Sequence, residues 1–383
     1  MPRCCLELEV PLPTPVRVRR SALLLVPVAL AVACSAGSTA RGPQRASPAP
    51  KASRPPAPGA TAAAQSRPPA GGPVTIAFGG DVHFMGASGV RLAADPNTAV
   101  GPMASVLRAA DLAIVNLETA ITTRGTPQLK TYRFRAPPSA FTALRAAGID
   151  VVSQANNHGM DFGLVGLHDS LDAARAARFP VVGIGLDDAT AYAPYRVTIR
   201  GSRVAVLGAT DVLDANLIGS WTAGPDKPGL ASAKDVPRLL AAVRAARSSS
   251  DTVIVYLHYG AELHACPTDA QRTLVRELVG AGADIIVGSH AHVLLGAGYF
   301  GDAYVDYGLG NFVFYVERQG PTRATGVLTL TVRGRAVTSS RWDPGTIEGG
   351  APRPLTGATA TSAVRRWEAL RDCTGLAAKP AGG

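Results

Sequence analysis

The sequence predicts an α/β domain with mixed sheets, preceded by a leader and a spacer. From residue 74 onward, short apolar runs typical of strands alternate with runs that have helical spacing. The end of the domain is instead rich in strands, with an expected hairpin over residues 325–342. Several of the apolar runs finish in Asp, Asn, Glu or His. Alternating strands and helices followed by a strand-rich end indicate an α/β domain whose sheets are mixed.

Residues 1–33 are expected to be a signal peptide of the lipoprotein type. Arginines precede an apolar run at residues 22–33 that is too short to span a bilayer. The run ends at Cys34 in a context that resembles the bacterial lipoprotein box, in which the Cys is acylated. An ordinary signal peptide cut nearby is the alternative. The residues before Val16 suit no signal peptide, which predicts that the true start codon lies near that position.

Residues 34–72 are expected to be a disordered tether, since Pro, Ala, Ser, Gly and Arg cannot bury enough surface to offset chain ordering. The formal net charge of the chain is +10, of which the leader holds +2 and the tether +5. Only +3 remains for the folded part, so no nucleic-acid partner is expected. The tether's charge either holds it near an anionic membrane or cell-wall polymer, or belongs to a solvated spacer. The expected location is extracytoplasmic, with Cys34 anchored in the cell membrane.

The predicted domain covers residues 73–345, and its first half alternates regularly between strands and helices. The strands are short runs rich in Val, Ile and Leu, and the helices carry apolar residues three and four positions apart. Gly79 and Gly80 follow the first strand and allow a sharp turn there. Strands are expected at 74–78, 112–118 and 150–153, and helices at 102–110, 139–147 and 163–178.

The second half of the domain continues this pattern and ends in strands. Asp269 is expected to cap the helix that it begins. Residues 346–383 are assigned to a C-terminal helix and tail. Strands are expected at 181–184, 195–199, 203–209, 252–258, 285–287, 325–332 and 337–342, a strand with a Gly-rich turn at 304–312, and helices at 236–247, 269–279 and 361–372.

Metal-ligand side chains follow many of these strands. His290 and His292 lie just past the apolar run at 285–287, where both rings can turn toward one ion or two adjacent ions. Loops at strand ends converge on one side of a sheet, so such residues meet there. A mixed oxygen and imidazole set suits Mn, Fe or Zn, although each His alone is equally a hydrogen-bonded loop residue. The candidates are Asp81, His83, Glu118, Asn157, His158, His258, His290 and His292.

Two further features have two interpretations each. Cys266 and Cys373 are the cysteines that remain after the leader and Cys34, and an even pair in an oxidising compartment favours a disulfide over two free thiols. A basic and aromatic loop is either a solvated edge or a contact for an anionic polymer. Its residues are Lys130, Tyr132, Arg133, Phe134 and Arg135.

Six motifs in chain order resemble those of the CapA family, which is named for poly-γ-glutamate capsule biosynthesis and belongs to the calcineurin-like metallophosphoesterase superfamily. The resemblance covers roughly residues 74–317. It implies a four-layer α/β/β/α sandwich of two mixed sheets, with the site at the strand ends, and an envelope location. The motifs begin at Gly80, Asn116, Ala155, His258, Gly288 and Gly308, the last one including Asn311.

The resemblance also implies roles for these residues. Two divalent ions are expected, with Glu118 shared between them. His158 resembles the superfamily's general acid, and Asp161 would orient its ring. Asn116 and Asn311 are expected to support the site, and Glu262 either partners His258 or contacts substrate. One ion would be bound by Asp81, His83, Glu118 and His292, and the other by Glu118, Asn157, His258 and His290.

Two functions follow from this interpretation. The first is a metal-dependent hydrolase that acts on a phosphoester or an anionic envelope polymer in capsule biosynthesis. The second is a non-catalytic component of capsule assembly or export that keeps the phosphoesterase fold as a scaffold, alongside other capsule synthesis proteins. His83 favours the first function, because it completes the Asp-x-His of the wider superfamily where many CapA relatives have an apolar residue.

Overall fold

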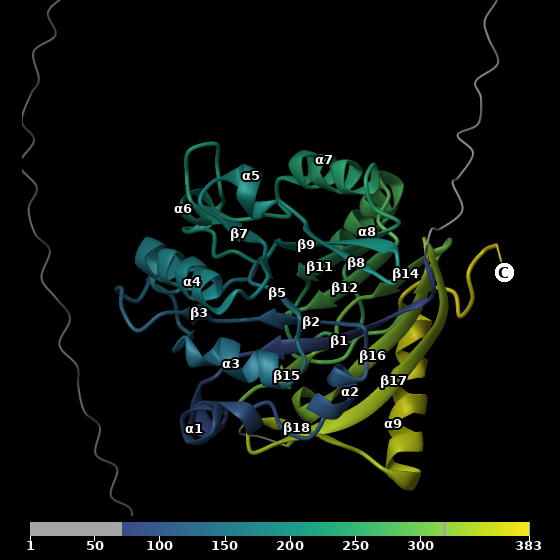
Figure 1. Ribbon diagram of the computed structural model, residues 1–383. Helices are drawn as coiled ribbons and strands as arrows, with labels where there is room; N and C mark the ends of the chain where they lie inside the picture. Colours follow the sequence, from purple (N-terminus) through teal and green to yellow (C-terminus); the bar gives the residue numbers. More distant parts are fainter. Residues whose placement is uncertain (1–70, 317–318, 383) are drawn as a thin grey trace, which may run out of the picture. The chain divides into compact units, whose positions relative to one another are not determined.

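Two mixed β-sheets lie face to face in the computed structural model, which describes residues 71–316 and 319–382 (Figure 1). The predicted leader, Cys34 and nearly all of the predicted tether lie outside these residues. Among the helices that are described, none has the length and apolar character needed to cross a membrane.

The first sheet is centred on β1, which runs parallel to β2 on one side and antiparallel to β16 on the other. The short strand β15 also pairs with β1, in parallel. In sheet order, the strands are β18 (Ala351–Pro354), β17 (Ala336–Glu348), β16 (Ala324–Arg333), β1 (Val74–Val82), β2 (Leu112–Leu117), β5 (Val151–Ser153) and β6 (Val181–Val182), with β15 at Asn311–Val313.

The second sheet is parallel at its centre and antiparallel at both edges. In order, its strands are β13 (Ala297–Phe300), β14 (Ala303–Asp306), β12 (Ile285–Ser289), β11 (Thr252–His258), β9 (Ser202–Thr210) and β8 (Tyr195–Ile199). Two short pairs lie outside both sheets: β3 (Ala120–Ile121) with β4 (Arg135–Ala136), and β7 (Ile184–Gly185) with β10 (Gly229–Leu230).

The helices cover the outer faces of the two sheets (Figure 1). The first sheet is covered by α1 (Gly86–Ala94), α2 (Ala104–Arg108), α3 (Ser139–Ala146) and α4 (Gly163–Ala177), and the second by α7 (Val236–Arg247) and α8 (Asp269–Ala281). The remaining helices are α5 (Asp188–Ala191), α6 (Ile218–Trp221), α9 (Gly357–Ala369) and the 3-10 turns η1 (Pro96–Thr98), η2 (Pro321–Arg323) and η3 (Leu370–Cys373). Helices, sheet, sheet and helices form the four layers that the resemblance implied.

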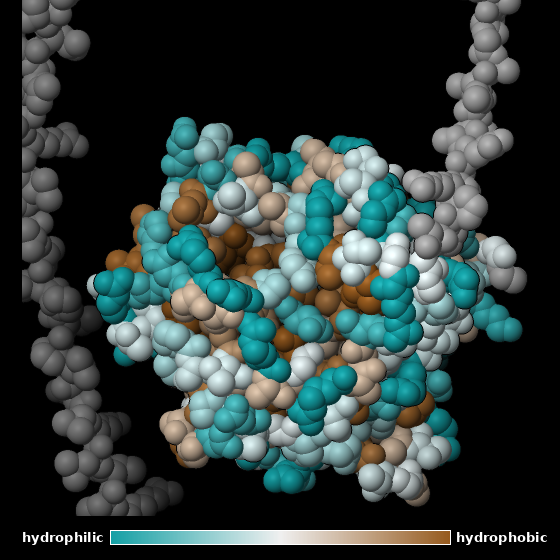
Figure 2. Space-filling view, viewed as in Figure 1, coloured by the Kyte–Doolittle hydropathy of each residue, from teal (hydrophilic) through white to brown (hydrophobic). Residues whose placement is uncertain are grey.

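Side chains of the central strands are buried on both faces of each sheet, in one core between the two sheets and in further cores under the outer helices. Ile76 of β1 packs between the sheets together with Ile254 of β11, whereas Ala77 and Val255, one position on, face the outer helices. Successive side chains of a strand point to opposite faces, so a strand buried on both faces must be apolar throughout. Burial of each large side chain contributes about 1.5–3 kcal/mol. On the face shown in Figure 2, hydrophilic and apolar side chains are mixed, and apolar side chains line a hollow in that face.

Three of the differences from the sequence prediction follow from particular contacts. β1 does not end at Phe78 but continues to Val82, because Gly80 lies so close to β15 that a Cβ there would be 1.9 Å from the carbonyl oxygen of Gly310. The predicted boundary at residue 345 falls inside β17, which continues and pairs with β18. The cap of α8 is Thr268, whose side chain accepts a hydrogen bond from the N–H of Gln271. Asp269, the predicted cap, is the first residue of the helix.

Candidate metal centre

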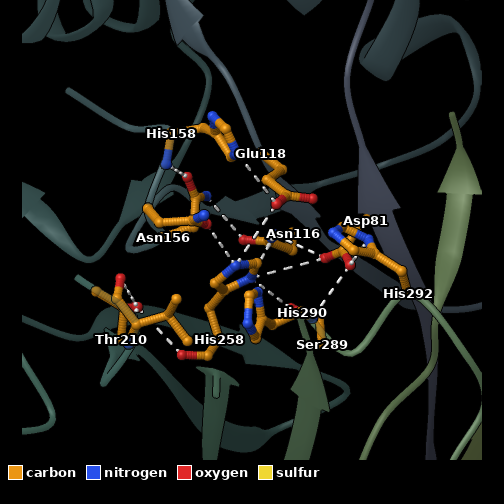
Figure 3. A network of polar contacts seen from close by, with 12 residues as sticks. Asp81, Asn116, Glu118, Asn156, His158, Thr210, His258, Ser289, His290 and His292 are labelled. Carbon is orange, nitrogen blue, oxygen red and sulfur yellow. Dashed lines mark hydrogen bonds and ion pairs between the residues drawn. The ribbon is translucent and has the colours of Figure 1, made fainter. Parts of the chain in front are cut away.

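The strands that carry the predicted ligands end at one edge of the two sheets. In the first sheet Asp81 of β1 is opposite Asn116 of β2, and in the second sheet His258 of β11 is opposite Ser289 of β12. Parallel strands bring their carboxyl ends to the same edge. The two edges meet, and the side chains that follow these strands form one polar network (Figure 3).

Asn116 joins the two sheets at this edge. Its Nδ2 donates to Asp81 Oδ1 at 2.8 Å and lies 3.1 Å from His258 Nδ1. Its Oδ1 accepts from Nδ2 of Asn156 at 3.0 Å. Asn156 in turn accepts the backbone N–H of His158 at 3.0 Å. Asn116 therefore sets the relative positions of the first aspartate, the β11 histidine and the loop after β5.

The partners of His258 indicate which ring nitrogen holds the proton. An amide NH2 only donates, so Nδ1 accepts from Asn116 and the proton of the neutral ring is on Nε2. That Nε2 lies 2.8 Å from Oδ1 of Asn157, which accepts. Burial lowers the pKa of His258 well below its usual value, so the ring is neutral at pH 7.

Glu118 is fully buried with no hydrogen-bond partner for either carboxylate oxygen within the described residues. Its Oε1 lies 3.6 Å from Nε2 of His258 and 3.8 Å from Nε2 of His158. Burial raises its pKa well above the usual value, and the nearby Asp81 carboxylate raises it further. A buried carboxylate without partners is costly unless a cation compensates it.

His290 and His292 turn toward this carboxylate. Their φ angles are 94° and 56°, in the left-handed region that residues other than glycine seldom adopt. Ligand atoms of Glu118, His290 and His292 lie within 4.8 Å of one another. His292 Nδ1 is 2.9 Å from Oδ1 of Asn311, an interaction that fixes the ring and leaves Nε2 available.

Asp81 faces both of these histidines. The backbone N–H of His290 donates to Asp81 Oδ2 at 3.1 Å, and Nδ1 of His292 lies 3.7 Å from the same oxygen. The carboxylate has no exposed surface, and burial raises its pKa. It is therefore a second buried acid beside Glu118.

His83 is buried beside the centre but has a different environment. Its Nδ1 accepts the backbone N–H of Met85 at 3.1 Å, so the proton of the neutral ring is on Nε2, which has no partner in the described structure. The ring stacks on Phe134, with centroids 4.5 Å apart, and packs edge-on against Phe314. With the proton on Nε2 the ring is a donor at that atom, and a metal could bind there only after the proton had moved, as at His258.

These donors fit a divalent cation. Two buried carboxylates with raised pKa values lie beside imidazoles whose pKa values burial has lowered, that of His290 to about 3. A bound cation would lower the pKa values of the two carboxylates. The imidazoles are neutral because their pKa values are low, so their lone pairs are free to bind it. Mixed carboxylate, amide and imidazole ligands suit Mn, Fe or Zn. The Glu118, His290 and His292 group could hold an ion.

His158 lies beside this group and is held by Asp161. His158 Nδ1 is 2.6 Å from Asp161 Oδ2, which also accepts the backbone N–H of Phe134 at 2.6 Å. Since a carboxylate only accepts, the ring proton is on Nδ1, and Nε2 faces Glu118. Burial lowers the pKa of His158 to about 4, although Asp161 opposes this shift.

The basic and aromatic loop enters the site at two points. Lys130 is nearly buried, with Nζ 2.9 Å from Asp161 Oδ1, and Phe134 lies between the rings of His83 and His158. Neither interpretation of the loop from the sequence foresaw this. Arg133 and Arg135 lie on the exposed side of the loop, the guanidinium of Arg135 4.7 Å from the ring centroid of Phe162.

A cavity of about 430 Å³ opens over His158 and His292. Glu262 lines it, whereas the ring nitrogens of His258 interact with Asn116, Ser289 and Asn157. Of the two roles expected for Glu262, the substrate contact is therefore the one that its position favours. The lining residues are Lys130, Thr131, Tyr132, Phe134, Asn157, His158, Asp214, Glu262, His292, Phe314 and Tyr315.

The structure thus gathers at one edge every predicted ligand, and it adds three residues that the sequence analysis did not assign to the site: Asn156, Lys130 and Phe134. Asn156 lies inside the Asn-Asn-His run, so its position next to a ligand was a usable signal. The other two lie on the loop between β3 and β4, away from the strand ends that carry the proposed ligands. Cys266 and Cys373, the pair expected from the sequence, form a disulfide between the loop after β11 and η3.

Comparisons with known proteins give the following matches. The family described as "Bacterial capsule synthesis protein PGA_cap" matches residues 75–316. "Capsule biosynthesis protein CapA" of Bacillus anthracis is 33% identical over 247 residues, covering 62% of this chain and 57% of that protein. "PGA biosynthesis protein CapA" of Bacillus subtilis (strain 168) is 33% identical over 222 residues, covering 57% and 56%.

Among solved structures, a hypothetical protein from Thermus thermophilus has a TM-score of 0.45 at 18% identity, covering 72% of this chain and 100% of that one. A putative 5'-nucleotidase from Staphylococcus aureus has a TM-score of 0.46 at 16% identity, covering 79% and 58%.

Proposed function

Because this chain belongs to the PGA_cap family of bacterial capsule synthesis proteins, we propose that it is a metal-dependent hydrolase of capsule or cell-envelope polymer biosynthesis. The two Bacillus relatives are named for capsule and PGA biosynthesis, and the matches span 57% and 56% of their lengths. The substrate we propose is a phosphoester or an anionic, poly-γ-glutamate-like polymer of the envelope, handled together with other capsule synthesis proteins.

One observation carries the proposal: the unpartnered carboxylate of Glu118, buried among imidazoles. A structural carboxylate in such a place would be hydrogen-bonded. We propose that Glu118 is shared by two divalent ions, Mn, Fe or Zn. Asp81 and His292 would bind one of them, and Asn157, His258 and His290 the other. Such ions lower the pKa of water and offset negative charge on phosphoryl oxygens.

The residues around the ions supply the rest of the chemistry. As water forms a new O–P bond and loses one of its two protons to solvent, the bond to the leaving group breaks and Nε2 of the His158 imidazolium gives its proton to the leaving oxygen. The ring is then neutral, with Nδ1–H still donated to Asp161, as in the structure. Phe134 covers one face of the ring and keeps water away from it.

This role requires His158 to be protonated when substrate is bound. With a pKa of about 4 the ring is neutral at pH 7 before substrate binds. A dianionic phosphoryl group beside Nε2 favours the charged ring and raises that pKa. Turnover should therefore respond to the charge of the substrate, and anionic phosphoesters are the substrates to test first.

The test compares wild type, His290→Ala and His158→Asn with an aryl phosphate ester and Mn. We expect wild type to hydrolyse the ester, and His290→Ala to lose both metal and activity. His158→Asn should keep its metal while turnover falls roughly 10²–10⁴-fold, the usual contribution of a positioned proton donor. A wild type that holds metal but cleaves neither phosphoesters nor glutamyl polymers would refute the hydrolase and support the assembly or export component instead.

We also propose that Cys34 carries lipid and anchors the protein outside the cytoplasm, where capsule polymers are assembled. The basic leader, its short apolar run and the basic tether support this proposal. A single acyl chain anchors weakly without a second signal such as basic charge. After expression in the host, Cys34→Ser should leave the membrane fraction while wild type remains in it. Equal partition of the two proteins would exclude the anchor.

A further inference from the structure

Lys130 is a nearly buried lysine next to the candidate metal centre. Only 6% of its side chain is exposed. Its Nζ lies 2.9 Å from Asp161 Oδ1 and donates to the backbone carbonyl of Asn157. The ammonium also lies 5.3 Å from the ring centroid of Trp221 and 3.8 Å from Asp214 Oδ2. Lysine side chains are seldom so buried unless their ammonium group is paired, as it is here.

Asp161 depends on this lysine. The carboxylate has no exposed surface. Its Oδ2 accepts from the ring of His158 and from the backbone N–H of Phe134, both at 2.6 Å, and its Oδ1 faces Lys130. Among the ion pairs of the described residues, Lys130 is the only Lys or Arg that contacts Asp161. Burying a carboxylate is costly unless charge and hydrogen bonds compensate it, and Lys130 supplies the nearby positive charge.

The same ammonium group holds the loop that carries Asn157. Its bond to the Asn157 carbonyl ties the loop after β5 to the loop that contains Phe134. Asn157 is a proposed ligand, and His158 follows it directly. Lys130 is therefore in contact with the two structures that determine where the His158 ring lies: its backbone and its carboxylate partner.

We propose that Lys130 is a positioning residue, which holds the Asp161 carboxylate and the Asn157–His158 backbone in place, so that the His158 ring keeps its proton on Nδ1 and presents Nε2 to the metal centre. This inference rests on the proposed function only for its consequence in catalysis. The arrangement of the ring can be measured without any turnover. Lys130 does not touch the reacting atoms, so its effect passes through His158.

The primary experiment is nitrogen NMR of the histidine rings in the full chain, freed of metal with a chelator. The His158 signals are assigned from their absence in His158→Asn. In wild type we expect a single tautomer, with the proton on Nδ1. In Lys130→Met we expect a mixture of tautomers or a broadened ring signal, because the ring has lost its fixed acceptor. Lys130→Arg, which keeps the charge, should restore the single tautomer at least in part.

The second measurement is turnover of the aryl phosphate with metal restored. We expect Lys130→Met to lower kcat about 10–100-fold, the usual effect of removing a group that orients a site residue, with KM little changed. Lys130→Gln, which keeps a donor but not the charge, should fall between Met and Arg. Lys227→Met is the matched control, since Lys227 also donates to a backbone carbonyl but lies exposed and away from the cavity.

The two measurements separate the inference from the proposed function. If wild type has no activity but its His158 tautomer depends on Lys130, the hydrolase fails and the positioning role stands. If Lys130→Met keeps the wild-type tautomer and kcat, the positioning role is wrong. Circular dichroism and thermal unfolding identify variants that do not fold. If Lys130→Met does not fold, the comparison of Lys130→Gln with Lys130→Arg takes its place. Equal histidine-ring spectra and equal kcat in these two variants would show that the charge of Lys130 is not required.

Discussion

His258 Nε2 lies 2.8 Å from Asn157 Oδ1, and this hydrogen bond crosses from the end of β11 in the second sheet to the loop after β5 in the first. Both atoms are of types that bind metal ions. The proton on Nε2 lies between them, where a cation would bind. A metal ion must displace that proton, since the nitrogen can bind metal only through its lone pair. When the proton moves to Nδ1, the hydroxyl oxygen of Ser289, 3.1 Å away, can accept a hydrogen bond from it.

Removing His258 should therefore reduce bound metal without separating the sheets. We expect His258→Ala to lose metal, measured as the metal-to-protein ratio after dialysis, because the lone pair is gone while Asn116 and Asn157 remain. The control is His168→Ala, which removes an exposed histidine of α4 outside the network. If His258→Ala has the same metal-to-protein ratio as wild type, His258 is not a metal ligand and serves as the hydrogen-bond donor of Asn157 instead.

His83 provides the opposite test. The Nδ1 of His83 accepts from Met85, and no hydroxyl lies at that nitrogen in the described residues as Ser289 does at His258. We therefore expect Nε2 to keep the proton and to be a donor rather than a ligand. We expect His83→Gln to change metal affinity by less than about threefold, well below the 10–100-fold effect of residues that orient ligands. Isothermal titration with Mn measures this, with His290→Ala as the variant that loses binding. A loss in His83→Gln as large as in His290→Ala would restore His83 to the ligand set.

The fold was predictable because its signals are local. The strand at 252–258 and the helix at 236–247 agree with the structure at both ends, since each is an apolar run bounded by polar residues. The end of β1 was not predictable. Gly79 and Gly80 read as a turn, but the close approach of Gly310, far along the chain, keeps these glycines in a strand. Tertiary packing overrode the local preference there.

The gathering of the proposed ligands was predictable for the same reason, as each follows an apolar strand. The contact of Lys130 with Asp161, the carboxylate beside His158, was not, because it comes from a loop whose sequence reads as a basic surface. Lys130 and Arg133 are both basic and close in sequence, yet one is buried against Asp161 and the other is exposed. No local signal separates them. Only the position of the loop relative to Asp161 and Trp221 does.

The disulfide should contribute to stability. It joins Cys266 to Cys373 across a sequence separation of 107 residues, so it limits the freedom of the unfolded chain strongly. We expect Cys373→Ser combined with Cys266→Ser to lower the free energy of unfolding by about 2–5 kcal/mol, measured by urea denaturation. Reductant should destabilise wild type by a similar amount and leave the double variant unchanged. A wild type insensitive to reductant would show that the bond does not limit stability.

Asp306 predicts a pH dependence that is independent of metal. It is fully buried at the end of β14, its Oδ1 accepts the N–H of Gly308 at 2.8 Å, and its Oδ2 has no partner among the described residues. Burial raises its pKa from 3.8 to about 8. Between these values the folded protein binds a proton at this carboxyl and the unfolded chain does not. Stability must therefore fall as pH rises through this window.

Asp306→Asn should remove this dependence, because the amide does not titrate and its carbonyl can still accept from Gly308. We expect the stability of the variant relative to wild type to rise by up to about 1.4 kcal/mol per pH unit between about pH 4 and pH 8, and then to level off. Urea denaturation of both proteins in chelator, at about pH 5, 6, 7 and 9, measures the difference. Since Asp81 and Glu118 titrate in both proteins, their contributions cancel in it. Parallel curves for wild type and variant would mean that Asp306 has the same pKa in the folded and unfolded chains.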